Sequence, residues 1–293
     1  MPPSITRRRL RQFKFGKHDA TYLLAGATVG QFDKMLRIVR DRVAADDPSG
    51  AIVDGFSYAA ATWPKVNPSD LWSYILPNAF SDPYNHPASN HGKDFAQSWK
   101  RTAGFALERT FLEHYRGILG KNGVTIEMPH KARKRELLAG LGLGNQVDPD
   151  KADLLLIGQK PDGTEQCFGV AHVKASFAER RTDDVPLSEA LLNRGFYSPL
   201  LTMDCKGSPS PTPVNRGELG DVLDTEGDNR GQKRLDFERD RRFSACFSFN
   251  RNTKPTPLGQ DAAARVYVCD FKDADDEFSR QVTAHWKQRR GVR

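Results

Sequence analysis

Residues 153–174 read DLLLIGQKPDGTEQCFGVAHVK, and this stretch decides the fold. Its first part, residues 153–158, is a continuous apolar run of strand length that follows an opening aspartate. Residues 161–163 are Pro-Asp-Gly, a strong turn signal because proline presets the backbone and glycine tolerates a left-handed conformation. Residues 166–174 form the returning strand. The stretch is therefore predicted to be a β-hairpin.

The segments on either side of this hairpin predict a mixed α/β core, in which helices flank a mixed β-sheet. Upstream, residues 97–119 have helical character, with Ser98 as the N-cap and Gly120 as the stop, and residues 123–128 read as a strand. Residues 129–150 are basic and contain glycine, so we expect a loop with room for one helical turn. Downstream, we expect helices over 186–194 and 274–289 and strands over 198–205, 242–249 and 265–271.

A helical N-terminal extension is predicted before this core. Residues 19–45 carry apolar side chains at helical spacing, and residues 46–97 are mixed, with short helices expected near 68–75. Residues 207–234 are rich in Pro, Gly, Asn and Asp, and a loop of that length is usually functional or disordered. We expect two parts: a basic arm and helical region in residues 1–95, and the α/β core with the C-terminal strands and helix in residues 96–293.

The overall composition is that of a globular intracellular protein. The chain has 293 residues, of which 38% are hydrophobic and 28% charged, so it can bury a full core. No apolar run approaches the roughly 18 residues that a membrane span needs, and the N-terminus lacks the apolar region of a secretory signal. The four cysteines lie far apart without a CxxC pair, which argues against structural zinc and favours free thiols. We therefore expect a cytoplasmic protein without a membrane partner.

Positive charge is gathered in three clusters. The net charge is +7 and the isoelectric point is near 9.2. The clusters lie in residues 1–17, 131–135 and 287–293. Each cluster alone could be a solvated surface or tail, but three in one chain favour a polyanionic partner such as nucleic acid.

The predicted hairpin brings a carboxylate and an amine together. Asp153 opens the first strand and Lys174 closes the second, so antiparallel pairing places both at one edge of the sheet. A carboxylate there can hold Mg²⁺, a hard ion that prefers oxygen ligands and lowers the pKa of a bound water. A lysine beside it can orient a water and offset the charge that develops on a phosphorane. A phosphodiester-cleaving enzyme needs these groups.

This layout resembles the PD-(D/E)xK nuclease superfamily. There the first acid opens one strand, and a second acid and a lysine end the next; the matching positions here are Asp153, His172 and Lys174. His172 departs from the pattern, because imidazole is a poor ligand for Mg²⁺. In the type II restriction endonucleases that read CCGG-like sites, the second acid has moved from the strand to the following helix, so His172 points to that branch.

Two further segments are similar to that branch. Residues 174–180, KASFAER, resemble its K-x-S-x-R-(D/E)-R element, although Ala178 replaces the first arginine. Residues 98–108 are similar to the helix that precedes the core in BsaWI-like members. The resemblance covers roughly residues 97–205. It implies a restriction-endonuclease-like fold, a Mg²⁺ cofactor and double-stranded DNA as the substrate.

The helix-borne acid of that branch has two candidates here. Asp184 lies at the start of the predicted helix, ten positions after Lys174, and Glu189 lies inside it, fifteen positions after. The alternative role of Asp184 is a helix cap, and that of Glu189 is an exposed helical residue. Both candidates stay open as catalytic metal ligands beside Asp153, with Glu189 preferred because it is borne on the helix.

Glu108 is a further candidate acid. It falls within the apolar stripe of the helix predicted over 97–119, where a carboxylate costs several kcal/mol unless it is paired or near a metal. The resemblance places a glutamate of this helix toward the active site. The alternative is an acid at the edge of the stripe that reaches solvent.

The residues that follow Lys174 are the candidates for DNA contact. The resemblance places Glu179, Arg180 and Arg181 in the major groove, where arginine binds O6 and N7 of guanine and an acid accepts from N4 of cytosine. Ser176 belongs to the same element. The alternative is a surface ion-pair cluster, which contributes little energy.

The leading hypothesis is a Mg²⁺-dependent type II restriction endonuclease acting as a homodimer, because a palindromic site calls for two-fold protein symmetry. The resemblance also implies a cognate DNA methyltransferase as a partner in the same system. A repair or junction-resolving nuclease, and a DNA-binding module with a decayed site, are the alternatives. A second DxK triplet at 204–206, with Asp183 or Asp184 as its first acid, is less favoured because a predicted helix separates the acids.

Overall fold

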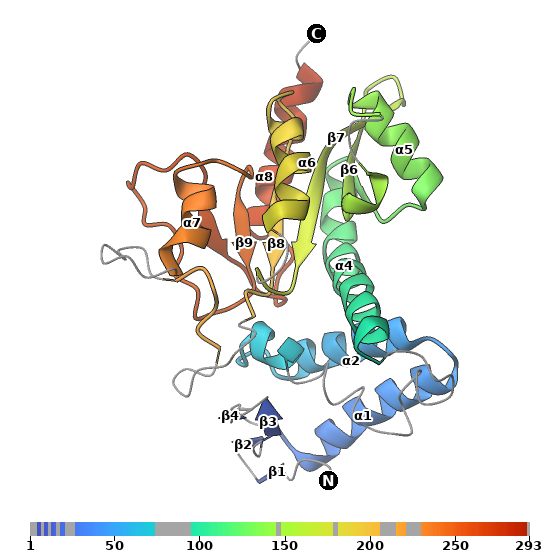
Figure 1. Ribbon diagram of the computed structural model, residues 1–293. Helices are drawn as coiled ribbons and strands as arrows, with labels where there is room; N and C mark the ends of the chain where they lie inside the picture. Colours follow the sequence, from blue (N-terminus) through green and yellow to red (C-terminus); the bar gives the residue numbers. More distant parts are fainter. Residues whose placement is uncertain are drawn as a thin grey trace.

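The centre of the molecule is a six-stranded mixed β-sheet in the order β10-β9-β8-β7-β6-β5 (Figure 1). The computed structural model describes residues 5–6, 9–10, 13–15, 18–20, 27–73, 95–144, 148–177, 181–205, 215–220 and 230–291. The strands are β5 (Val124–Glu127), β6 (Leu154–Gln159), β7 (Glu165–Lys174), β8 (Leu200–Thr202), β9 (Cys246–Ser248) and β10 (Val266–Val268). β5, β6 and β7 pair antiparallel, whereas β7, β8, β9 and β10 pair parallel. This confirms the predicted mixed α/β core.

The hairpin predicted over 153–174 is present as β6 and β7. The two strands pair antiparallel, with Leu154 opposite Ala171 at the end that carries the candidate site. Gly163 of the connecting turn has a φ of 82°, a conformation that glycine adopts without steric cost. Gly169 of β7 has to lack a side chain, because a Cβ there would lie 2.3 Å from the Tyr197 carbonyl oxygen.

Helices cover both faces of this sheet (Figure 1). They are α4 (Phe95–Lys121), α5 (Lys131–Gly140), α6 (Arg181–Leu192), α7 (Arg230–Glu238) and α8 (Glu277–Gly291). One face packs against α4 and α8, and the other packs against α5, α6 and α7. Because side chains alternate along a strand, Leu154 belongs to the first face and Leu155 to the second. The face of the sheet to which a β7 side chain points therefore decides which helices that side chain contacts.

Several element boundaries differ from the prediction. Residues 129–150, expected as a loop, contain the ten-residue helix α5. Helix α6 begins at Arg181, five residues before the predicted start. The strands β8, β9 and β10 are three residues each, shorter than predicted. Of the loop expected over 207–234, the structure describes residues 215–220 and, from residue 230, the helix α7.

The N-terminal extension is helical from residue 29 onward. Helix α1 (Val29–Ala44) opens with a capping box between Thr28 and Gln31, and α2 (Pro48–Thr62) lies across the N-terminal end of α4 (Figure 1). Buried side chains of α1 and α2 join the hydrophobic cluster of α4 and the sheet. One core thus continues across the boundary expected between residues 95 and 96, and that division stays a prediction.

Residues ahead of α1 differ from the expected helix over 19–45. Two short antiparallel strand pairs precede it, β1 (Ile5–Thr6) with β2 (Arg9–Leu10) and β3 (Phe13–Phe15) with β4 (His18–Ala20). The predicted basic arm lies partly outside the described residues. Elsewhere, Cys167, Cys246 and Cys269 are free and buried, as predicted. Among the described helices, none is both long and apolar enough to cross a membrane.

A polar network joins the extension to the C-terminal half of the sheet. Asn67 Nδ2 donates to Asn250 Oδ1 at 2.8 Å, and Asn215 Nδ2 donates to Ser69 Oγ at 2.5 Å. Asp70 is half-buried in this network, and burial raises its pKa to about 7. The packing of the extension is therefore linked to the protonation of one carboxyl group.

The substitution Asp70→Asn should stabilise the protein at alkaline pH. The folded state keeps the Asp70 proton up to about pH 7, whereas the unfolded chain loses it near pH 3.8. Folding thus takes up a proton between these values, and the stability of the wild type falls as the pH rises through that window. We expect the advantage of the variant to grow by about 4 kcal/mol between pH 4 and 8, measured by urea unfolding. Parallel pH profiles of the two proteins would contradict this.

Candidate active site

The end of the hairpin forms the predicted acid–lysine pair. Asp153 lies just before β6, and its Oδ2 accepts hydrogen bonds from Lys174 Nζ and from the Val173 backbone N–H, both at 2.8 Å. Both side chains are buried, with 7% of Lys174 and 9% of Asp153 exposed. The pair is therefore a charge-assisted contact held inside the protein, with the carboxylate fixed by two donors.

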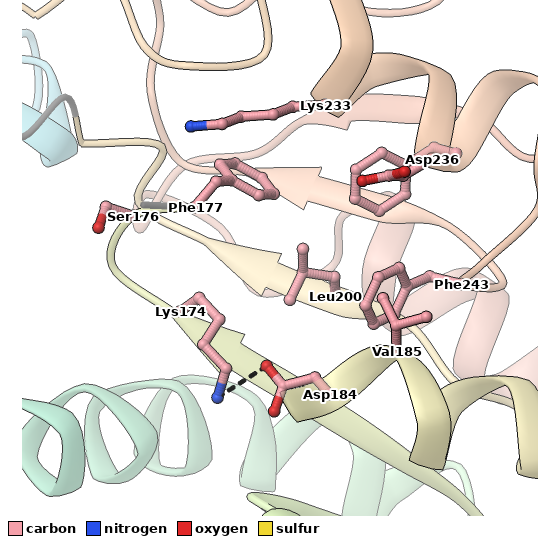
Figure 2. Close-up of a pocket in the computed structure, with 10 residues that line it drawn as sticks. Lys174, Ser176, Phe177, Asp184, Val185, Leu200, Lys233, Asp236 and Phe243 are labelled. Carbon is pink, nitrogen blue, oxygen red and sulfur yellow. Dashed lines mark ion pairs between the residues drawn. The ribbon is translucent and has the colours of Figure 1, made fainter. Parts of the chain in front are cut away.

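Helix α6 brings a second carboxylate to the same ammonium. Alternation along β7 directs His172 and Lys174 to the face that α6 covers, and Asp184 approaches from the helix. Lys174 Nζ lies 3.1 Å from Asp184 Oδ2, and only 5% of the Asp184 side chain is exposed. Figure 2 shows the two side chains pointing toward one another from β7 and α6. Lys174 thus contacts both acids at once.

Glu189, the other candidate for the helix-borne acid, lies elsewhere. Its side chain is 50% exposed and its Oε1 is 3.9 Å from Arg242 Nη1. Five positions along a helix turn a side chain by about 140° relative to Asp184, so the two acids cannot face the same strand. The structure therefore brings Asp184, and not the preferred Glu189, next to Asp153 and Lys174.

His172 is fully buried beside this cluster. Its Nε2 lies 3.0 Å from Ser198 Oγ, which in turn lies 2.7 Å from Ser188 Oγ of α6. The ring packs against Phe243 in an edge-to-face arrangement. Burial lowers the pKa of His172 to about 4, so the ring is neutral at physiological pH. Its other nitrogen, Nδ1, has no hydrogen-bond partner among the described residues.

The same residues form a possible metal centre. One ligand atom each from Asp153, His172 and Asp184 lie within 4.8 Å of one another, and all three residues are buried. Two carboxylates and an imidazole fit a divalent cation, which accepts oxygen and nitrogen donors of this kind. Lys174 places a positive charge beside both carboxylates, so it offsets part of the negative charge that would be costly to bury alone.

The remaining predicted residues lie around or beyond this cluster. Ser176 is half-buried and lines a pocket beside Lys174, together with apolar side chains such as Phe177 (Figure 2). Glu108 is half-buried on α4, and the group of possible metal ligands among the described residues does not include it. Arg181 is the first residue of α6, but its side chain is not among the parts that the structure describes. Glu179 and Arg180 lie outside the described residues altogether.

Asp204, of the less favoured DxK triplet, has a different environment. Its carboxylate accepts hydrogen bonds from Thr253 Oγ1 at 2.6 Å and from the backbone N–H of Glu218 at 2.6 Å. It is fully buried, and burial raises its pKa to about 6. Asp204 therefore anchors the segment 215–220, while Lys206 is outside the described residues.

The prediction missed the two serines next to His172. Ser188 and Asp184 are four positions apart on α6, which places them on one face of the helix. Ser198 directly precedes β8, whose parallel pairing with β7 sets Leu200 opposite His172. The sequence shows only the i, i+4 spacing of Asp184 and Ser188. That spacing indicates a shared role near His172 only when the buried face of α6 is known.

The chain is similar to known restriction endonucleases. No protein-family model matches the chain. The type II restriction enzyme AgeI of Thalassovita gelatinovora is 35% identical over 243 residues, which cover 80% of this chain and 83% of that protein. A crystal structure of a specific AgeI–DNA complex aligns with a TM-score of 0.79 and 30% identity, covering 94% of this chain and 99% of that one. A crystal structure of a pre-specific BsaWI–DNA complex aligns with a TM-score of 0.47 and 18% identity, covering 90% and 93%.

The substitution Lys174→Met should destabilise the fold in a way that a divalent cation relieves. It leaves two buried carboxylates without their shared cation, and losing one partner of a buried ion pair costs about 3–5 kcal/mol. We expect urea unfolding in a metal chelator to show a loss of this size, and added Mg²⁺ or Mn²⁺ to restore part of it. The matched control is Lys233→Met, because Lys233 is 29% exposed beside Glu218 and should cost less than about 1 kcal/mol. Equal losses in the two variants would contradict the prediction.

Proposed function

The chain belongs to the type II restriction enzymes, which are sequence-specific endonucleases of DNA, and we propose that it cleaves double-stranded DNA through a Mg²⁺ ion held by Asp153 and Asp184. The observation that carries this proposal is the buried cluster in which Lys174 Nζ contacts both carboxylates, at 2.8 and 3.1 Å. Carboxylate oxygens are the ligands that Mg²⁺ prefers. The site is of the PD-(D/E)xK type, with Asp184 on α6 supplying the acid that the pattern would place at position 172.

The residues of the cluster have different roles in phosphodiester hydrolysis. When bound, Mg²⁺ polarises the scissile phosphate and lowers the pKa of the attacking water. Lys174 keeps a positive charge in a buried site, where it stabilises the negative charge of the phosphoryl transition state better than it would in water. The Val173 backbone N–H holds the Asp153 carboxylate in one orientation. Glu108 on α4 stays a candidate catalytic acid.

The segment that follows Lys174 is the proposed DNA-reading element. Ser176 lies at the rim of the pocket beside Lys174, and Glu179, Arg180 and Arg181 follow it in the sequence. Arginine binds guanine through two hydrogen bonds in the major groove, and glutamate accepts one from cytosine. These residue types favour a short palindrome of the CCGG kind as the recognition sequence.

A palindromic site implies a particular assembly. Two copies of the chain related by two-fold symmetry would each read one half-site and each present one cluster to one strand. The active form is therefore a homodimer on DNA. A cytoplasmic enzyme of this kind requires a cognate DNA methyltransferase of the same specificity, which protects the host's own sites.

The two acids of the cluster should both be essential for cleavage. We expect Asp153→Asn and Asp184→Asn each to lower the rate of plasmid cleavage in Mg²⁺ at least ~1,000-fold, which corresponds to about 4 kcal/mol of transition-state stabilisation. Glu189→Gln is the matched control, since Glu189 lies on α6 but outside the cluster, and its rate should change less than about threefold. A large loss in Glu189→Gln with an active Asp184→Asn would overturn the assignment of Asp184.

The recognition element can be tested by the ends that the enzyme produces. Run-off sequencing of cleaved plasmid should give one palindromic site that contains CCGG. The substitution Arg180→Ala should lower kcat/KM on that site about 10- to 100-fold, because a bidentate base contact contributes about 1–3 kcal/mol. Arg194→Ala, in the exposed turn that follows α6, serves as the control. Random degradation, or cleavage of branched DNA alone, would contradict the proposed specificity.

A further inference from the structure

His172 differs from the other described histidines with an unpartnered ring nitrogen because it lies beside two buried carboxylates. It is completely buried, yet its Nδ1 has no hydrogen-bond partner among the described residues. A buried polar atom without a partner typically costs about 1–3 kcal/mol. The ring also lies in the one group of described residues whose ligand atoms, from Asp153, His172 and Asp184, converge within 4.8 Å. A ligand nitrogen of the ring thus lies close to both carboxylates, and Nδ1 is the ring nitrogen that the described residues leave without a hydrogen bond.

A chain of two serines holds the imidazole from its other side. Ser198 Oγ lies 3.0 Å from His172 Nε2 and 2.7 Å from Ser188 Oγ, and the Ser198 backbone N–H donates to Ser244 Oγ at 2.8 Å. When Nε2 carries the proton and donates it to Ser198, the hydroxyl of Ser198 can donate to Ser188. That direction of donation leaves Nδ1 with a free lone pair. Histidines that bind metals are oriented in the same way, by a hydrogen bond from the ring nitrogen that does not bind.

We propose that His172 is a nitrogen ligand, through Nδ1, of the divalent ion held by Asp153 and Asp184, and that Ser198 and Ser188 are positioning residues that set its tautomer. This inference rests on the proposed function, because it adds a ligand to the same metal centre. Asp153 and Asp184 supply the charge that binds the ion, and the neutral imidazole supplies a third donor without adding charge.

The mixed donor set has a consequence for the choice of ion. Imidazole binds Mg²⁺ poorly but suits first-row transition metals, and affinity for nitrogen donors rises from Mn²⁺ to Co²⁺. His172 should therefore make Mn²⁺ and Co²⁺ bind more tightly than a site of two carboxylates would, while contributing little to Mg²⁺. The site would thus offer both oxygen and nitrogen ligands, whereas Mg²⁺ prefers oxygen ligands alone.

Pulsed electron paramagnetic resonance of the Mn²⁺-loaded full-length protein tests the bond directly. A nitrogen nucleus bound to Mn²⁺ modulates its electron spin echo, and this readout does not depend on catalysis. We expect nitrogen modulation in the wild type. In His172→Gln the modulation should vanish, and Mn²⁺ should stay bound through Asp153 and Asp184 with an affinity reduced about 10-fold.

Matched variants separate a ligand from a structural role. His114 is also largely buried with an orphaned ring nitrogen, but it lies outside the metal cluster, so His114→Gln should keep the modulation unchanged. Ser198→Ala removes the partner of Nε2 and should weaken Mn²⁺ binding about 10-fold, whereas Ser279→Ala, at a buried serine of α8 that bonds Asp276, should not. If His172→Gln fails to fold, His172→Asn replaces it, because the asparagine amide lies near the position of Nδ1.

The outcomes distinguish this inference from the proposed function. Bound Mn²⁺ without nitrogen modulation in the wild type would overturn the ligand role of His172. If the same preparation cleaves DNA and Asp153→Asn abolishes cleavage, the proposed function still stands. Modulation that persists in His172→Gln would also overturn the inference, since another nitrogen would then be the ligand. Failure of the wild type both to bind Mn²⁺ and to cleave DNA would overturn both proposals.

Discussion

The site depends on one buried ammonium group. Lys174 Nζ lies 2.8 Å from Asp153 and 3.1 Å from Asp184, and none of the three side chains is more than 9% exposed. Two carboxylates at this depth would repel one another and lose their hydration unless a cation stood between them. The lysine therefore allows the two acids to be buried side by side in the folded protein. Lys174 can contact both acids only because the end of β7 packs against the start of α6.

The order of elements after the hairpin brings the end of β7 and the start of α6 into contact. A parallel β8 requires a crossover connection from β7, and α6 provides it across one face of the sheet. The crossover carries Asp184 and Ser188 past the end of β7, and the chain then returns through Ser198 beside His172. Of the N-terminal helices, α2 packs against α4, which lies on the opposite face, and both α1 and α2 share its hydrophobic cluster. The charged cluster is thus built by the hairpin and its crossover, while the extension contributes to the shared hydrophobic core.

The sequence predicted the parts of the site whose signals are local. The apolar run and the Pro-Asp-Gly turn predicted the hairpin, and the ends of its strands placed Asp153 beside Lys174. The choice between Asp184 and Glu189 was not predictable, because it depends on which face of α6 packs on the sheet, and the helix begins five residues earlier than its pattern indicates. Helix α5 was not predicted although KARKRELLAG consists largely of good helix formers, because basic charge and nearby glycines are also typical of a loop. The contacts of Ser198 arise from parallel strand pairing, which has no local signal.

The position of the second acid explains why a histidine is acceptable at the end of β7. With Asp184 supplied by the helix, a carboxylate at position 172 would put a third negative charge next to one ammonium, in a place without water to screen it. A neutral ring avoids that cost, and its pKa of about 4 keeps it neutral over the physiological range. The ring then needs a fixed orientation, which Ser198 and Ser188 supply. Under the proposed function, an acid on the helix leaves position 172 open to a side chain without charge, and the histidine then agrees with an intact site.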